Sequence, residues 1–91
     1  MTVQVTETDD IATCHRLRFA VFVEEQGVSV EDEVDGRDGD AVHLLATQGG
    51  APVGCARVLV EGGSAKIGRV CVLPGARRQG TGTALVRAAV E

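Results

Sequence analysis

The chain has 91 residues, a net charge of −4 at pH 7, 44% apolar residues and only two aromatic residues, both Phe. This length suits one small domain, and the acidic balance argues against nucleic-acid binding, which needs a basic surface. No apolar run approaches the roughly 20 residues of a membrane-spanning helix, and the opening MTVQVTETDD lacks the basic and apolar segments of a signal peptide. We therefore expect a cytoplasmic protein with an aliphatic core, no membrane partner and no nucleic-acid partner.

The first two predicted elements are a strand and a helix. TVQVT alternates apolar and polar residues, which predicts a short strand around 3–5. Thr8 is a suitable N-cap, and apolar residues recur at helical spacing from Ile11 to Val21. We therefore predict a helix at about 9–22.

An acidic segment follows this helix. Six of the ten residues from Glu31 to Asp40 are acidic, and glycines interrupt them. A solvated loop with a short helical turn explains the composition; a cation site or a contact for a basic substrate are the alternatives. An EF-hand loop is excluded, because alignment on Gly36 puts Val42 where the bidentate Glu must stand.

Three strands are predicted next, at 41–48, 52–61 and 64–73. The glycine pairs at 49–50 and 62–63 separate these runs, which are rich in β-branched residues. Such short connections give an antiparallel meander.

Pro74 ends the last strand, because proline donates no hydrogen bond to a sheet. A helix is predicted from Gly80 onward. The element order is therefore β-α-(loop)-β-β-β-α, and the predicted fold class is mixed α/β.

The cysteines are Cys14, Cys55 and Cys71. Their number is odd and no C-x-x-C pair occurs, which argues against a disulfide framework and against a zinc site. Each lies in an apolar run, which favours small buried side chains with free thiols. We expect no metal.

A glycine-rich turn joins the last strand to the last helix. Gly80 and Gly82 let the backbone approach an anion closely, at a helix start whose amides have no internal partner. Arg77 and Arg78 add positive charge. Thr81 stands where a Walker A loop needs Lys, and the dinucleotide fingerprint lacks its third glycine. The turn is predicted to hold phosphate or pyrophosphate, with ordinary turn chemistry as the alternative.

Four ordered segments resemble one known family. Arg77, Gly80 and Gly82 match the R/Q-x-x-G-x-G/A signature of the GCN5-related N-acetyltransferase (GNAT) superfamily. RFAVFVEEQGVS, EVDGRDGDAVHLLA, PVGCARV and KIGRVCVLPGARRQGTGTALV together resemble its ElaA-like branch. The resemblance implies a GNAT-like sheet and an acetyl-CoA-dependent transfer of an acetyl group to a small-molecule or peptide amine, by direct attack.

The resemblance also implies a set of cofactor-binding positions. The glycine turn would bind the pyrophosphate through main-chain amides, and the preceding strand would pair with the pantetheine arm. The N–H of Val72 would polarise the acetyl carbonyl. The implied positions are Val70, Cys71, Val72, Arg77, Arg78, Gln79, Gly80, Thr81, Gly82 and Thr83.

The candidate catalytic residues are Glu25 and His43, which stand at family-matching positions and could accept the amine proton. Each has a structural alternative. Glu25 could pair with an arginine such as Arg18 or Arg57, and His43 could form a hydrogen bond inside the sheet.

Two arginines on adjacent predicted strands, Arg57 and Arg69, have two possible roles. They could bind a substrate carboxylate, or they could pair with the acidic loop at Asp35 and Asp38.

The chain also departs from the resemblance. The superfamily normally continues past this helix with a further strand and with a helix that commonly carries a Tyr, whereas this chain contains no Tyr. We therefore expect the N-terminal part of an N-acetyltransferase domain, spanning 1–91, with an open sheet edge that promotes homodimer formation. A non-catalytic module that binds CoA or another protein is the alternative function.

Overall fold

The computed structural model describes residues 3–33, 36, 38–77 and 80–89. In chain order the elements are β1 (Val3–Thr8), α1 (Ile11–Arg18), the π-helical η1 (Phe19–Glu25), α2 (Val30–Glu33), the 3-10 turn η2 (Asp38–Asp40), β2 (Ala41–Gln48), β3 (Ala51–Glu61), β4 (Ser64–Val72), the 3-10 turn η3 (Pro74–Ala76) and α3 (Thr81–Ala89). The predicted order β-α-(loop)-β-β-β-α is confirmed. No helix in these ranges is long and apolar enough to cross a membrane.

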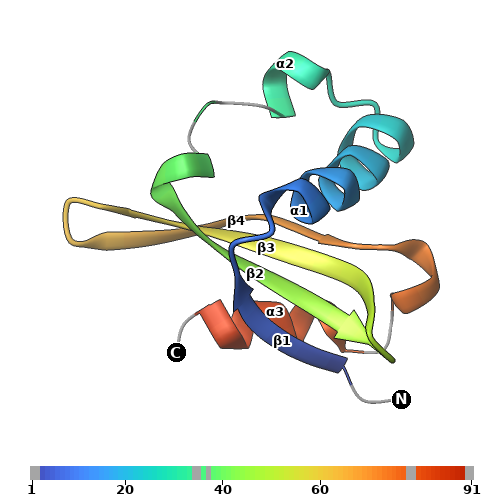
Figure 1. Ribbon diagram of the computed structural model, residues 1–91. Helices are drawn as coiled ribbons and strands as arrows, with labels where there is room; N and C mark the ends of the chain where they lie inside the picture. The colour runs from blue at the N-terminus through green and yellow to red at the C-terminus, as the bar shows by residue number, and fades with distance from the viewer. Residues whose placement is uncertain (1–2, 34–35, 37, 78–79, 90–91) are drawn as a thin grey trace.

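The four strands of the described chain form one antiparallel sheet in the order β1-β2-β3-β4. Helix α1 lies on one face of this sheet and α3 on the opposite face (Figure 1). The predicted meander is therefore present, and each face of the sheet has a helical cover.

Each face has its own small core. Cys14, Leu17 and Val21 pack on the α1 side against Cys55 and Cys71. On the α3 side the buried residues are Leu44, Ala46, Ala56, Val58 and Leu85. Burial on both faces explains why the strands appear in the sequence as nearly continuous apolar runs rather than as strict alternations.

The first helix differs from its predicted bounds and cap. The N-cap is Asp10 rather than Thr8, because the carboxylate of Asp10 accepts hydrogen bonds from the amide (3.2 Å) and the hydroxyl (2.6 Å) of Thr13. The α-helix ends at Arg18, and the chain continues as the π-helical η1. At the C-terminal end of η1 the amide of Gln26 donates to the carbonyl of Val21, five residues earlier (3.1 Å). Such wider turns occur often at functional sites.

A bulge interrupts β4. Cys55 pairs with Cys71, and Arg57 pairs with Gly68, so β4 has one more residue than β3 between these pairs. The extra residue allows Arg69 to adopt a left-handed backbone with φ of 51°. Because the bulge shifts the alternation by one residue, Ile67 and Val70 both pack on the α3 side despite their odd spacing.

Gly54 allows β4 to lie close to β3. A Cβ at this position would lie 2.6 Å from the carbonyl oxygen of Cys71 and 3.4 Å from Leu85. A side chain cannot fit there without movement of the backbone. A lone glycine within a strand pattern is typical of such a close approach.

Candidate functional site

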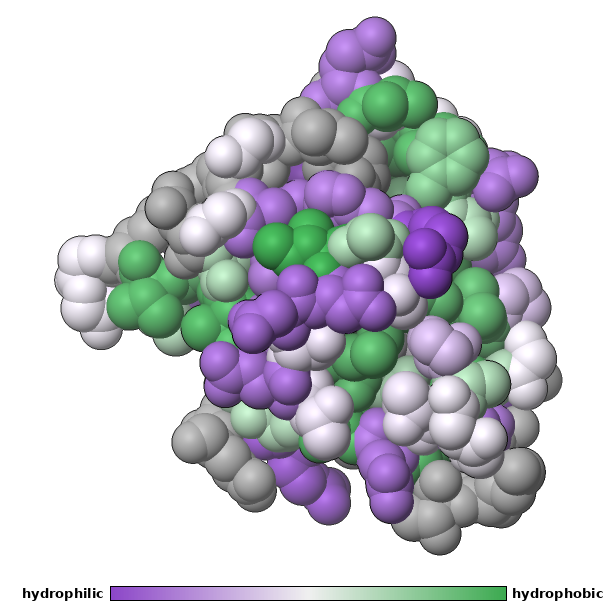
Figure 2. Space-filling model, in the orientation of Figure 1, coloured by the Kyte–Doolittle hydropathy of each residue, from purple (hydrophilic) through white to green (hydrophobic). Residues whose placement is uncertain are grey.

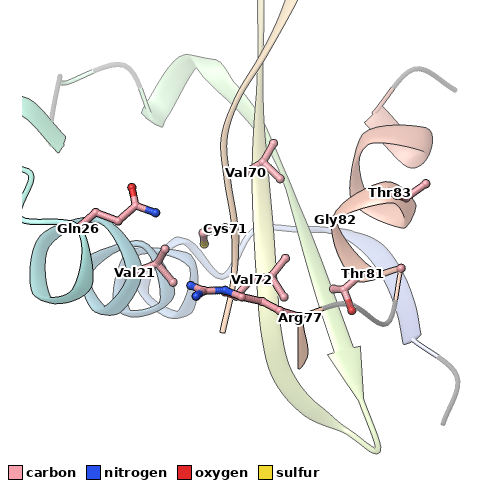
Figure 3. A pocket seen from close by; sticks show the side chains of 10 residues that line it. Val21, Gln26, Val70, Cys71, Val72, Arg77, Thr81, Gly82 and Thr83 are labelled. Carbon is pink, nitrogen blue, oxygen red and sulfur yellow. The ribbon is translucent and has the colours of Figure 1, made fainter. Parts of the chain in front are cut away.

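A hollow of about 410 Å³ lies between η1, the end of β4 and the start of α3 (Figure 3). Its lining combines two residues of the η1 region, Val21 and Gln26, with a larger set from β4, the following turn and α3. That larger set is Val70, Cys71, Val72, Arg77, Gly80, Thr81, Gly82 and Thr83. All eight are predicted cofactor positions; the other two, Arg78 and Gln79, lie outside the described residues.

The start of α3 forms one end of this hollow. Gly80 precedes the helix with a positive φ of 81°, and its carbonyl accepts the amide of Ala84 (2.9 Å). The buried hydroxyl of Thr81 donates to the carbonyl of Ala76 (3.2 Å), which ties the helix start to η3. The first amides of a helix have no intrahelical partner and lie at the positive end of its dipole. This end of the hollow can therefore hold an anion.

Arg77 joins the two sides of the hollow. Its Nε donates to the carbonyl of Val72 (2.9 Å), and its Nη1 donates to Oε2 of Glu25 (2.7 Å), with a second contact from Nη2 to Oε1. The hydrogen bonds from Arg77 lower the pKa of Glu25. The arginine partner of Glu25 is thus Arg77 rather than Arg18 or Arg57. Because the two residues are 52 positions apart in the chain, no local sequence pattern indicates this pair.

The middle of the hollow is the edge of β4. Among the described residues, β3 is the one strand that pairs with β4, so the opposite edge of β4 faces the hollow. The amide of Leu73 donates to the carbonyl of Val53 in β3 (2.8 Å), whereas the carbonyl of Val72 accepts from Arg77. In a strand, the N–H and C=O of one residue point to the same edge of the strand, and those of the next residue point to the other edge. Leu73 is bonded to β3, so the N–H of Val72 lies on the open edge, beside its own carbonyl.

Two further hollows meet the first at Val70. One, of about 280 Å³, is lined by Phe22, Val28, Arg69 and Val70. The other, of about 590 Å³, extends along α3 past Val86. The bulge at Arg69 therefore places Val70 at a junction of three hollows. Arginine has no intrinsic preference for a left-handed backbone, so no residue pattern indicates this bulge.

His43 lies in a different part of the molecule. Among the described residues it does not line the first hollow; it is buried on β2, where its Nε2 donates to the carbonyl of Asp38 (2.9 Å). The Asp38 carboxylate accepts from Arg18 (2.8 Å), Arg57 (3.2 Å) and Nε2 of His15 (2.6 Å). Arg57 was expected either to bind a substrate carboxylate or to pair with the acidic loop; in the structure it pairs with Asp38.

The charges around Asp38 decide its ionisation. Burial alone would raise the pKa of this carboxyl, but the hydrogen bonds from Arg18, His15 and Arg57 outweigh burial and hold the pKa well below its usual value. The second acidic candidate, Asp35, lies outside the described residues. Within the described ranges no three His, Cys, Asp or Glu side chains are arranged to hold a metal ion.

Comparison with known proteins gives a consistent result. The model of the acetyltransferase (GNAT) domain matches residues 39–91. A Bacillus subtilis protein named "Putative acetyltransferase" is 42% identical over 88 residues, which are 93% of this chain and 60% of that protein.

Two crystal structures have the same fold. An acyl-CoA N-acyltransferase from Pseudomonas aeruginosa superposes with a TM-score of 0.84 at 34% identity. Escherichia coli ElaA superposes with a TM-score of 0.82 at 28% identity. Each match covers 98% of this chain and 68% of the other chain.

The chain spans about half to three fifths of the length of the curated relatives that it matches. The family match covers more than half of the chain and includes β2, β3, β4 and α3, the elements around the glycine turn. The chain belongs to the GNAT acetyltransferase family.

Proposed function

We propose that residues 1–91 form the N-terminal part of an acetyl-CoA-dependent N-acetyltransferase domain, and that the first hollow holds the cofactor. The observation that carries this proposal is the convergence of eight family-matching positions on one hollow, at a helix N-terminus and beside a free strand edge. The P. aeruginosa structure is named as an acyl-CoA N-acyltransferase, which also supports an acyl-CoA cofactor.

The residues of the hollow suit the parts of that cofactor. The amides from Gly80 to Thr83 would hold the pyrophosphate at the positive end of α3. The outer edge of β4 at Val70–Val72 would pair with the amide groups of the pantetheine arm, as a sheet edge pairs with a peptide. When bound, the cofactor supplies an acetyl group activated as a thioester.

Val72 would then stabilise the transition state. Its N–H lies on the open edge of β4 and would donate to the carbonyl oxygen of the acetyl group, where negative charge develops during attack by the amine. The neighbouring carbonyl of Val72 is already bound to Arg77, which fixes this part of the backbone. Direct attack needs no covalent intermediate on the protein.

The acceptor amine would occupy the second hollow, which adjoins the first at Val70. We propose a small-molecule or peptide amine. Phe22 and Val28 offer apolar contact, and Arg69 would bind a carboxylate if the acceptor carries one.

Glu25 and His43 stay our candidates for the general base. Glu25 is held near the hollow by Arg77, but the same contact lowers its pKa and so its strength as a base. His43 is buried and bound to Asp38. Replacement of each by Gln, with measurement of the rate across pH, separates a residue that accepts the proton from one that supports the fold.

The location and assembly are also proposals. We propose a cytoplasmic protein, which the three free and buried thiols support. We propose a homodimer in which the partner covers the open edge of β4, since an exposed edge readily pairs with another strand.

A transfer assay tests the proposed function. Purified chain is incubated with acetyl-CoA and a panel of small-molecule and peptide amines, the release of free CoA thiol is followed, and CoA binding is measured on the same sample. We expect CoA binding together with amine-dependent thiol release. Binding without transfer to any amine would favour the non-catalytic module, and absence of both would overturn the assignment of the hollow.

A further inference from the structure

The three cysteines meet in the core on the α1 side of the sheet. Their exposed fractions are 0% for Cys14, 1% for Cys55 and 3% for Cys71, and all three are free thiols. The Sγ atoms of Cys55 and Cys71 lie 3.3 Å apart. The Sγ of Cys55 also donates to the carbonyl oxygen of Cys14 (3.7 Å).

The strand register favours a bond between Cys55 and Cys71. The two residues are directly opposed partners of β3 and β4, immediately beside the bulge. Directly opposed residues of antiparallel strands have Cα atoms about 4.5 to 5.5 Å apart, and disulfides form at Cα separations of about 4.4 to 6.8 Å. The strands therefore need not move apart or slide for the two sulfurs to join.

Access and acidity distinguish the two thiols. Cys71 lines the first hollow, so a molecule as small as a peroxide can reach it from there, whereas Cys55 is not among the lining residues described. The hydrogen bond with Cys55 lowers the pKa of Cys71 despite burial. Contacts with Cys14 and Cys71, together with burial, raise the pKa of Cys55. Because the thiolate is the reactive form, Cys71 is the sulfur that attacks.

We propose that Cys71 and Cys55 form an oxidation site, at which hydrogen peroxide produces a cross-strand disulfide. The Cys71 thiolate attacks one peroxide oxygen, the O–O bond breaks, and Cys71 becomes a sulfenic acid with release of hydroxide. That hydroxide accepts the Cys55 proton. The Cys55 thiolate then attacks the Cys71 sulfur and displaces the sulfenic oxygen as hydroxide. This hydroxide takes up the proton that Cys71 released when it ionised, so that overall two thiols and one peroxide give one disulfide and two waters.

The disulfide would fasten the edge strand β4 to β3 at the wall of the hollow. A link between residues 55 and 71 restricts the unfolded chain. We therefore expect the oxidised protein to melt at a higher temperature than the reduced protein, and reducing agent to reverse the shift.

Peptide mapping tests the site directly. Trypsin cleaves after Arg16, Arg37, Arg57 and Arg69, among other positions, so each cysteine lies in its own peptide. Untreated protein, alkylated after denaturation without reduction, is expected to show three alkylated cysteines. After mild peroxide treatment we expect the Cys55 and Cys71 peptides joined, with a mass two hydrogens below their sum, and Cys14 still alkylated.

Variants separate the two sulfurs. Cys14→Ser is expected to form the same link as the parent, whereas Cys55→Ser is expected to stop at a Cys71 sulfenic acid that dimedone traps. Mapping of the parent protein decides the matter even if a variant folds poorly. A Cys14–Cys55 link, or three alkylated cysteines after peroxide treatment, would overturn the proposal.

Discussion

At the scale of single residues, Asp38 joins parts of the chain that are distant in sequence. Its carboxylate binds Arg18 and His15 of α1 and Arg57 of β3, and its carbonyl binds His43 of β2. Arg18 is only 1% exposed. A buried guanidinium is tolerated only where a negative charge compensates it.

We predict that Asp38→Asn lowers the free energy of unfolding by about 3 kcal/mol, because it leaves the charge of Arg18 without its carboxylate in the interior. Urea titration at pH 7 measures the change. Asp9→Asn serves as control, since Asp9 is exposed and should alter stability by no more than about 0.5 kcal/mol. Equal stability of Asp38→Asn and the parent would show that the cluster contributes little.

The loss of stability in Asp38→Asn should also depend on pH. The pKa of Asp38 is lowered in the folded chain, so its stabilisation is present above the unfolded value of about 3.9 and is lost as the pH falls through the lower folded value. The difference in unfolding free energy between the parent and Asp38→Asn should therefore shrink as the pH falls below about 4. A difference that stays constant or grows towards pH 2 contradicts the assignment.

Sequence reasoning found some of these residues but few of their contacts. The position of Arg57 among apolar strand residues predicted that it binds either a substrate carboxylate or the acidic loop. Its partner is Asp38 of that loop. Pairing of Glu25 with an arginine is confirmed, but the arginine is Arg77 rather than either example, Arg18 or Arg57, because Arg77 reaches Glu25 only when η1 and the end of β4 pack together. Pairing between distant charges depends on tertiary structure, which local patterns do not contain.

At the scale of elements, the strands and turns were predictable because glycine pairs separate β-branched runs. The interruptions within elements were not. Apolar residues keep helical spacing from Ile11 to Val21, so the change from α1 to η1 after Arg18 leaves no mark in the pattern. The bulge at Arg69 is equally hidden, although it decides which side chains of β4 face each core.

Gly54 allows a prediction for β3. We expect Gly54→Ala to lower the free energy of unfolding by about 1 to 3 kcal/mol, because the new Cβ would lie 2.6 Å from the carbonyl oxygen of Cys71 and force β3 and β4 apart. Chemical denaturation measures the loss. Gly68→Ala is the matched control on the neighbouring strand, since its Cβ would meet no atom within 4 Å. Similar losses in both variants would refute the close-approach argument.

At the scale of the whole molecule, the described chain is a sheet with helices on both faces (Figure 1). Of the two edge strands, β1 and β4, it is β4 that lines three hollows. Figure 2 shows apolar surface on the protruding β3–β4 hairpin, where Val60 is 67% exposed. The family motif predicted the fold at this scale, because four ordered segments fix a topology. The motif does not predict the shape of the hollows, because that shape depends on η1 and on the bulge at Arg69.

We predict that the isolated chain forms a dimer at micromolar concentration, with the partner covering the open edge of β4. Light scattering coupled to size exclusion should give twice the mass of the chain. Because the proposed cofactor uses the same edge, added CoA should shift the population towards monomer. A single-chain mass without CoA contradicts this prediction.

The central claim is that the start of α3 and the edge of β4 together hold CoA. A Cβ on Gly82 would lie 3.9 Å from Cγ2 of Val72, so Gly82→Val places its methyl groups in the space between α3 and β4. Gly39→Val is the control, because the Cβ would meet no atom within 4 Å and the residue lies in η2. Calorimetric titration with CoA is the measurement, with circular dichroism to verify folding. We predict binding by the parent and by Gly39→Val, and none by a folded Gly82→Val; equal binding by Gly82→Val, or no binding by the parent, would contradict the claim.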